Sequence, residues 1–200
     1  MHSVQPRDPY GAALGAVRRL AEAGRFVPGE PIVVTDLAAE VGFSPTPVRE
    51  ALACLAGQGL IERRRGRGYF YPALTASEVI DLFELQLAYL HAALTLHPRG
   101  LAPLRKAVMS VDPLNGVQTL FDAIITQSAN AALALAHQRL VDRLGAVLKA
   151  EKGNDYGDGA TVQAMVRVIN KGDIPALLDL LEDHHERRCA RASMLLIQTA

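Results

Sequence analysis

The chain has 200 residues, 50% of them hydrophobic, and its 21 basic side chains are balanced by 21 acidic ones. This length suits one large domain or two small ones, and the charge balance excludes a strongly basic nucleic-acid coat or an acidic tail. No apolar run approaches the ~18 residues that a membrane span needs, and the first residues lack the apolar stretch of a signal peptide. We therefore expect a soluble cytoplasmic protein whose two cysteines, Cys54 and Cys189, are reduced and buried.

Periodicity and turn residues predict five elements in the first third of the chain. In order, these are helices over residues 9–24, 37–41 and 47–57 and strands over residues 60–64 and 69–71, with a turn over residues 26–31. Thr35 or Asp36 can cap the second helix. Because a residue before a proline disfavours helical conformation, we expect Thr46 to be the N-cap of the third helix and Pro47 its first residue.

Residues 35–49 have the layout of a helix-turn-helix, in which two helices are joined by a tight turn. The small Ala38 lets the helices approach closely, and Gly42 allows the backbone conformation of the turn. The second helix carries an apolar stripe formed by Val48, Leu52 and Leu55. Arg49 falls on another face, in the first turn, where recognition helices contact base edges. Arginine is also the side chain best suited to donate two hydrogen bonds to guanine.

A hairpin rich in arginine follows the helix-turn-helix. Arg63, Arg64, Arg65 and Arg67 lie in and beside its tip, and all nine basic side chains of residues 1–72 are arginines. Arginines at such a tip can enter a narrow minor groove or neutralise phosphates. An arginine run on a hairpin is by itself commonly a solvated strand. Its combination with a helix-turn-helix within ~40 residues is much more specific and indicates DNA binding.

Beyond residue 75 the sequence predicts helices only. They are expected over residues 76–96, 100–110, 115–128, 130–150, 160–171 and 174–198, with one long loop at residues 153–159. The expected fold class is therefore mainly α. A winged helix-turn-helix with a small β-hairpin occupies residues 1–74, and an all-α helical bundle occupies residues 75–200.

Residues 9–72 resemble the winged-helix domain of the GntR family of bacterial transcription regulators. The matching segments are Pro28–Glu30, Leu37–Ser44, Thr46–Leu52, Gly59–Ile61 and Arg65–Gly68. The helical remainder is similar, more loosely, to the C-terminal domain of the FadR-type branch, at residues 81–85, Phe121, residues 128–130 and Gly172–Asp173. The resemblance implies a homodimeric regulator, expected to be a repressor, that binds a palindromic operator and responds to a small metabolite such as an organic acid.

The resemblance also implies which residues contact DNA. The family's DNA contacts carry over to Thr46, Arg49, Arg65 and Gly66, and the candidate DNA-binding residues are these four together with Thr35, Ser44 and Arg67. Two positions depart from the family pattern. Pro45 stands where the family usually has arginine, and Thr35 stands where it often has a basic residue. We therefore expect an operator that differs from the family norm.

Many members of this branch bind a divalent metal through one aspartate and three histidines. The corresponding positions here are Gln118, Asp122, a position near Val162, and His184. These leave too few ligands for a firm site, so we expect no metal and no other cofactor. Gln86, Gln118, Asp122 and His184 are instead candidates to line an effector-binding pocket.

The remaining histidines and the basic residues of the last helix carry weaker signals. His184 and His185 with Arg187 and Arg188 could form an anion-binding wall, but we expect His185 and Arg188 to be solvated. Three further histidines show no ligand spacing and are expected on the surface or in an ordinary core: His91, His97 and His137.

Two other functions stay open at this point. The lost ligand positions favour a regulator whose helical part only dimerises and binds no effector. A small helical enzyme is the third candidate. It is opposed by the absence of a nucleophile–base set, a GxSxG turn, a phosphate-binding loop and a CxxC pair. We therefore expect no enzymatic activity.

Overall fold

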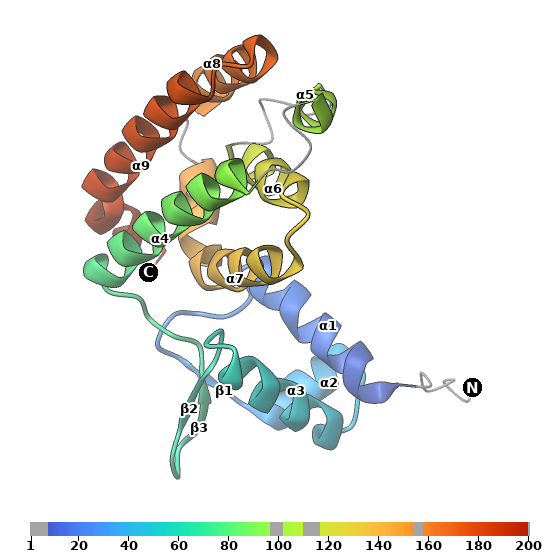
Figure 1. Cartoon of the computed structure of the whole chain (residues 1–200). Coiled ribbons are helices and arrows are strands. Elements are labelled where there is room, and N and C mark those ends of the chain that lie inside the picture. Colours follow the sequence, from blue (N-terminus) through green and yellow to red (C-terminus); the bar gives the residue numbers. More distant parts are fainter. Residues whose placement is uncertain (1–7, 97–101, 110–116, 154–157, 200) are drawn as a thin grey trace. The chain divides into compact units, whose positions relative to one another are not determined.

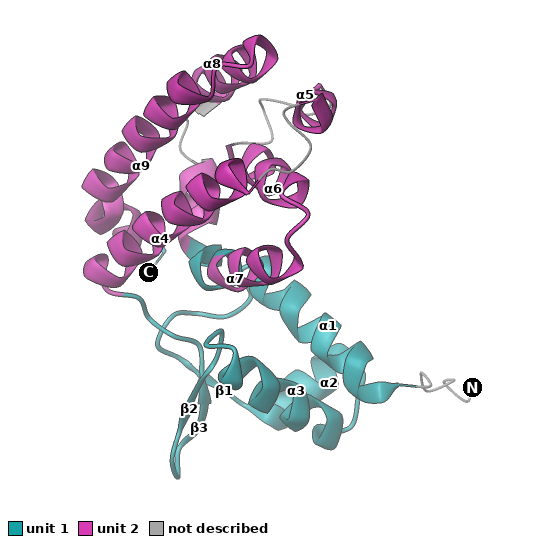
Figure 2. Ribbon diagram, viewed as in Figure 1, with its two compact units in different colours: residues 1–74, 141–146, 199–200 teal, residues 75–140, 147–198 magenta. Residues whose placement is uncertain are grey.

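The computed structural model describes residues 8–96, 102–109, 117–153 and 158–199 (Figure 1). The chain divides into two compact units, which are described separately. The first consists of residues 1–74, 141–146 and 199–200, and the second of residues 75–140 and 147–198 (Figure 2). Parts of the predicted helices over 100–110 and 115–128 and of the loop at 153–159 lie outside the described residues.

The first unit contains three helices and a small sheet. In chain order they are α1 (Pro9–Glu22), β1 (Pro31–Ile32), α2 (Val34–Val41), α3 (Pro45–Gly57), β2 (Glu62–Arg64) and β3 (Gly68–Phe70). β3 lies between β1 and β2 and pairs antiparallel with both. Sequence analysis predicted the β2–β3 hairpin but placed Pro31 in a turn. Pro31 is tolerated because it is the first residue of an edge strand, where no N–H group is required.

The start of α3 differs from the prediction. The helix begins at Pro45 with Ser44 as its N-cap, so the expected N-cap role of Thr46 is wrong. Pro47 occupies the third helical position. A proline is tolerated there because the first N–H groups of a helix have no acceptor within it.

The start of α2 also lies earlier than predicted. Its N-cap is Val33, whose extended backbone precedes Val34, and the carbonyl of Val33 accepts the N–H of Leu37 at 3.0 Å. No side chain caps this helix, so the expected capping by Thr35 or Asp36 is wrong.

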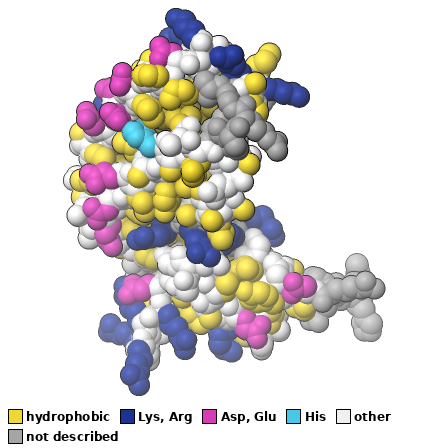
Figure 3. Space-filling view, viewed as in Figure 1, with side chains coloured by type: hydrophobic (Ala, Val, Ile, Leu, Met, Phe, Trp, Pro, Cys, Tyr) yellow, Lys and Arg dark blue, Asp and Glu magenta, His cyan; other side chains and the backbone are white. Residues whose placement is uncertain are grey.

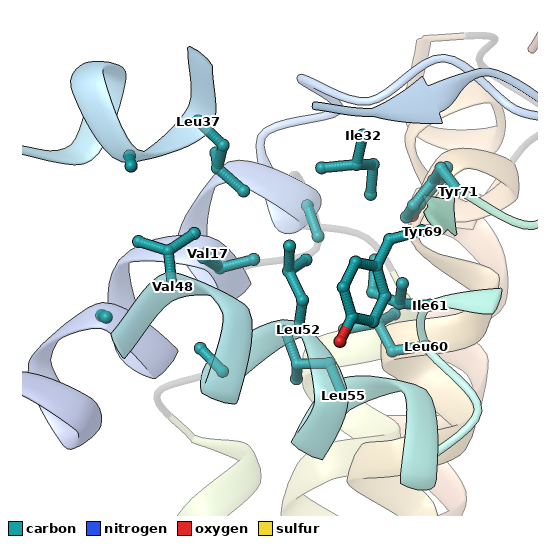
Figure 4. Close-up of a cluster of buried hydrophobic side chains, with 14 residues drawn as sticks. Val17, Ile32, Leu37, Val48, Leu52, Leu55, Leu60, Ile61, Tyr69 and Tyr71 are labelled. Carbon is teal, nitrogen blue, oxygen red and sulfur yellow. The ribbon is translucent and has the colours of Figure 1, made fainter. Parts of the chain in front are cut away.

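One buried apolar cluster joins α1, α2, α3 and the sheet (Figure 4). Val48, Leu52 and Leu55 are fully buried in it, as their spacing predicted. Val17 of α1 and Tyr69 of β3 belong to the same cluster. Full burial of an aliphatic side chain stabilises a fold by roughly 1.5–3 kcal/mol, so this stripe fixes which face of α3 points outward.

The second unit is helical throughout its described residues, which confirms the mainly α fold class. Its helices are α4 (Ala76–Thr95), α5 (Ala102–Val108), α6 (Val117–Gln127), α7 (Ala131–Gly153), α8 (Asp158–Lys171) and α9 (Ile174–Ile197), except that residues 141–146 of α7 belong to the first unit. α4 packs along α9, which also packs on α8. Thr75 and Glu78 form a reciprocal capping box at the start of α4. Cys54 and Cys189 are free and half-buried rather than buried. None of the described helices combines the length and apolar character needed to cross a bilayer.

Two glycines of the helix-turn-helix predict stability changes of opposite sign. Gly42 ends α2 in the left-handed region (φ 75°), whereas Gly57 closes α3, and an added Cβ would meet nothing within 4 Å at either position. Gly42→Ala is therefore expected to lower the free energy of unfolding by about 1 kcal/mol through backbone strain. Gly57→Ala should raise it by about 0.5 kcal/mol, because alanine lowers the conformational entropy of the unfolded chain. Urea denaturation checks both, and shifts of equal sign would contradict this assignment.

Candidate nucleic-acid interface and buried polar cluster

Two prolines, rather than a capping side chain, build the start of α3. Ser44 is the N-cap in an extended conformation (φ −71°, ψ 159°), but its side chain makes no capping hydrogen bond. Pro45 and Pro47 have no N–H group, so two of the donors that a helix start leaves unpaired are absent. Among the first three helical residues, Thr46 alone offers a backbone N–H to an anion at the positive end of the helix dipole.

All the candidate DNA-binding residues are exposed, and they come from three places in the first unit. They are Thr35 in the first turn of α2, Ser44, Thr46 and Arg49 at the start of α3, and Arg65, Gly66 and Arg67 at the hairpin tip. The hydroxyl of Thr35 donates to the Asp36 carboxylate at 3.2 Å. The hydroxyl of Tyr69 in β3 donates to the backbone carbonyl of Arg49 at 3.4 Å. This long hydrogen bond links the hairpin to the start of α3.

The arginines of the first unit fall into two groups. Side chains of the same unit hold three of them: Arg18 bonds to Gln58, Arg25 to Glu40, and Arg64 to Glu62. Within the described residues, six others form no ion pair and no side-chain hydrogen bond: Arg49, Arg63, Arg65 and Arg67 at the start of α3 and in the hairpin, and Arg19 and Arg143 elsewhere. Lys and Arg side chains gather over the β2–β3 hairpin in Figure 3. The positive charge available to a ligand is therefore concentrated at the hairpin and at the start of α3.

The hairpin tip is a tight turn whose backbone at Gly66 is not covered by other atoms. The N–H of Arg67 donates to the carbonyl of Arg64 at 3.0 Å, and Gly66 has a φ of 73°. A positive φ at the third residue is typical of a type II turn, which favours glycine there. An added Cβ on Gly66 would have no atom within 4 Å, so the backbone at the tip can approach another surface closely.

Arg64 holds the two strands of the hairpin together. It donates from Nε and Nη2 to the two carboxylate oxygens of Glu62 at 2.9 and 2.8 Å, and its guanidinium lies 4.1 Å from the centre of the Phe70 ring. The register explains this geometry, because Glu62 faces Phe70 while Arg64 faces Gly68, which has no side chain to fill the space. The hydrogen bond from Arg64 lowers the pKa of Glu62 and raises that of Arg64, so both stay ionised.

A chain of hydrogen bonds runs through the interior of the second unit. The buried amide nitrogen of Gln86 on α4 donates to Gln118 on α6 at 3.1 Å and to the ring of His137 on α7 at 3.3 Å. Gln118 donates in turn to Asp122 at 2.9 Å. Arg188 on α9 donates to the oxygen of Gln86 at 2.6 Å. Because arginine only donates, this bond fixes the orientation of the Gln86 amide. The chain therefore points from Arg188 to the carboxylate of Asp122.

His137 is neutral within this cluster. Gln86 donates to its Nε2, so the proton lies on Nδ1, which faces an oxygen of Asp122 at 3.7 Å. Burial lowers the pKa of His137 to about 4. Partial burial raises the pKa of Asp122, and the hydrogen bond from Gln118 opposes that shift. The Asp122 side chain is still 57% exposed, so the cluster reaches solvent at this residue.

Three of the four candidate effector residues come together in the structure. Gln86, Gln118 and Asp122 are joined by hydrogen bonds, whereas His184 packs against the ring of Phe121, with 5.7 Å between ring centres. The Nε2 of His184 is buried without a hydrogen-bond partner. Sequence analysis missed the link of His137 to this cluster, because its partners lie on other helices.

The expectation that His185 and Arg188 are solvated is wrong. Each residue is 2% exposed, because α9 packs along α4 and α8. A signal was available, since five buried residues recur at helical spacing along α9: Leu177, Leu181, Arg188, Ala192 and Leu195. His91 is half-buried and lies 3.6 Å from Glu182, whereas His97 lies outside the described residues.

The residues at the metal-ligand positions of the family do not fit a divalent ion. Gln118 and Asp122 are bonded to each other, and Val162 is a fully buried apolar side chain. His184 remains as a lone histidine, and one imidazole with one carboxylate does not make a firm site. Across the described segments, no three His, Cys, Asp or Glu side chains are placed to hold a metal ion.

Comparisons with known proteins agree with this geometry. Residues 9–70 match the bacterial regulatory proteins, gntR family. The chain is 39% identical over 67 residues to the Nta operon transcriptional regulator of Aminobacter aminovorans, which covers 34% of this chain and 32% of that protein. Overall, the chain matches between 32% and 64% of the length of its curated relatives. These relatives are named as transcriptional regulators and not as enzymes.

Two solved structures share the fold at low sequence identity. One is E. coli McbR/YncC, with 19% identity, a TM-score of 0.68 and 100% of each chain covered. The other is a putative transcriptional regulator GntR from Rhodococcus sp. RHA1, with 18% identity and a TM-score of 0.75, covering 92% of this chain and 97% of that one.

The buried histidines predict that stability falls in mild acid. Burial and the nearby charge of Arg188 lower the pKa of His184 to about 2 and of His185 to about 3. The unfolded chain binds protons below pH ~6.5 while the folded chain does not, so the free energy of unfolding decreases as the pH falls from there. Each such histidine contributes up to about 1.4 kcal/mol per pH unit. His185→Gln should therefore flatten the slope between pH 6 and 5, and an unchanged slope would refute its role.

Proposed function

We propose that residues 9–70, which match the bacterial regulatory proteins of the gntR family, form a helix-turn-helix domain of that family, and that the chain is a DNA-binding transcription regulator. It acts as a repressor and binds a palindromic operator as a homodimer, and its second unit belongs to the FadR-type branch. One observation supports DNA binding most strongly. The start of α3 and the hairpin tip both present exposed arginines that no described side chain engages.

Each exposed residue at these two places has a role that suits its chemistry. Arg49 reads a guanine in the major groove. Thr46 binds a phosphate through its hydroxyl and backbone N–H, and Ser44 lies beside it at the helix start. At the tip, Arg65 and Arg67 enter the adjacent minor groove or neutralise its phosphates. Two further contacts are proposed at positions without charge: Gly66, whose bare backbone allows close approach, and Thr35 at the start of α2.

We propose that an organic acid or similar metabolite regulates binding through the second unit. Asp122 and Gln118 form the end of the polar cluster that reaches solvent, Gln86 is its buried member, and His184 is buried against Phe121. A ligand that binds one arrangement of the helices more tightly than another would shift the protein toward that arrangement. The affinity for DNA would then change by as much as the ligand's affinities for the two arrangements differ.

A regulator whose helical unit only dimerises is the second candidate. The observation that favours it is the saturation of the cluster, in which Gln86 already bonds to Gln118, His137 and Arg188. Thermal-shift measurements with organic acids separate the two candidates, because a ligand that binds the folded state raises the unfolding midpoint.

The recognition role of Arg49 predicts a loss that depends on DNA sequence. Arg49→Ala should weaken binding to the selected operator by roughly 1–3 kcal/mol, because two hydrogen bonds to guanine are lost. Binding to random duplexes should change much less. Arg167→Ala is the control, since Arg167 is an exposed arginine of α8 in the second unit. Fluorescence anisotropy checks these affinities, and an equal loss on both DNAs would exclude base reading.

The hairpin predicts that neighbouring arginines differ in their salt dependence. The slope of log K against log salt is negative, and Arg65→Ala should reduce its magnitude by about 0.9, the value for one phosphate contact in duplex DNA. Arg64→Ala should leave that slope unchanged, because Arg64 is engaged by Glu62 and Phe70. Titrations at several salt concentrations measure both slopes. A slope of smaller magnitude for Arg64→Ala would show that Arg64 contacts DNA itself.

A further inference from the structure

Arg188 is an ionised group inside the helical unit, and its partners come from two other helices. Its side chain is 2% exposed. Nε and Nη2 donate to the two carboxylate oxygens of Glu151 on α7 at 2.8 and 2.7 Å, and Nη1 donates to Gln86 on α4. The guanidinium carbon lies 3.9 Å from the centre of the Phe83 ring, also on α4. One cation therefore joins α4, α7 and α9.

The surroundings of Arg188 suit a guanidinium in particular. A buried ion is unfavourable unless it is paired and hydrogen-bonded. The planar fork of arginine matches the Glu151 carboxylate with two parallel bonds, and the face of Phe83 attracts the cation. Arginine also keeps its proton when buried, which lysine and histidine do not. The Arg188–Glu151 pair is neutral as a whole, so it joins the helices without leaving a net charge in the interior.

Arg188 also lies next to the residues at the metal-ligand positions. It follows His184 by one helical turn of α9, and it shares Gln86 with Gln118. A divalent ion held by Gln118 would be separated from the positive charge of Arg188 by the amide group of Gln86 alone. The donor set and the charge therefore both disfavour a metal.

We propose that the helical unit of this chain holds no divalent ion at the family positions, and that the buried guanidinium of Arg188 joins three of its helices without one. The family's ligand positions lie on α6, α8 and α9, whereas Arg188 on α9 joins α4 and α7 through oxygen acceptors and an aromatic ring. In this chain the helical unit folds around an arginine and requires no metal. The proposal concerns the helical unit alone and does not rest on the DNA-binding function.

The first test measures metal dependence in the unaltered protein. Thermal unfolding of the full chain is followed after dialysis against excess EDTA, and again with added Zn²⁺, Ni²⁺ or Mn²⁺. The expected result is the same midpoint in every condition, with no metal retained after gel filtration. A midpoint that EDTA lowers, or one ion per chain by elemental analysis, would overturn the proposal.

The second test compares two neighbouring arginines on α9. Arg188→Gln should lower the folding equilibrium constant by at least about 100-fold, because Glu151, whose side chain is only 12% exposed, loses its partner. Arg187→Gln is the matched control. Its ion pair with Asp183 is exposed, so the change should stay below about fivefold. Equal effects of the two substitutions would contradict a central role for Arg188.

A double variant separates the loss of the cation from general disruption. Arg188→Gln combined with Glu151→Gln should recover a large part of the stability that Arg188→Gln loses, since two neutral amides need no charged partner. Additive losses would show that the two residues do not act as a pair. If Arg188→Gln does not fold, the metal measurements on the unaltered protein still decide the matter.

Discussion

The orientation of α3 depends on the burial of its apolar stripe. Val48, Leu52 and Leu55 have no exposed surface and pack within a cluster that also holds α1, α2 and the small sheet. A rotation of the helix would expose these side chains at a cost of several kcal/mol, so the exposed face, with Arg49, is held outward. The DNA-binding proposal rests on this constraint, because an arginine can read a base only when its backbone is fixed in place.

The arginines of this chain separate into those that build the fold and those that remain available to a ligand. Arg64, bonded to Glu62 of its own strand, joins the two hairpin strands through the ring of Phe70, and Arg188 joins three helices of the second unit. The side chains of Arg49 and Arg65 are exposed and form no hydrogen bond or ion pair with the described residues. Residue type and net charge do not reveal this division. It follows from the register of two strands in the first unit and from helix packing in the second.

Local patterns were enough to predict much of the first unit. The turn at Gly42 and the buried stripe of α3 follow from a few neighbouring residues. β1 could not be predicted, because Pro31 and Ile32 form a strand only by pairing with β3. Arg188 was misjudged for a similar reason. Its partner Glu151 lies 37 residues away on another helix. Without knowledge of that partner, a charged side chain is expected to be exposed to solvent even where its neighbours form an apolar stripe.

Selection of bound sequences from a random duplex library, using the whole chain, tests the DNA-reading role of α3 most directly. The expected outcome is an enriched, two-fold symmetric site with a guanine at a fixed place in each half. The centres of the two halves should be separated by one helical turn of about 34–36 Å or a multiple of it. Recovery of sequences no different from the starting library, at moderate salt, would contradict this role.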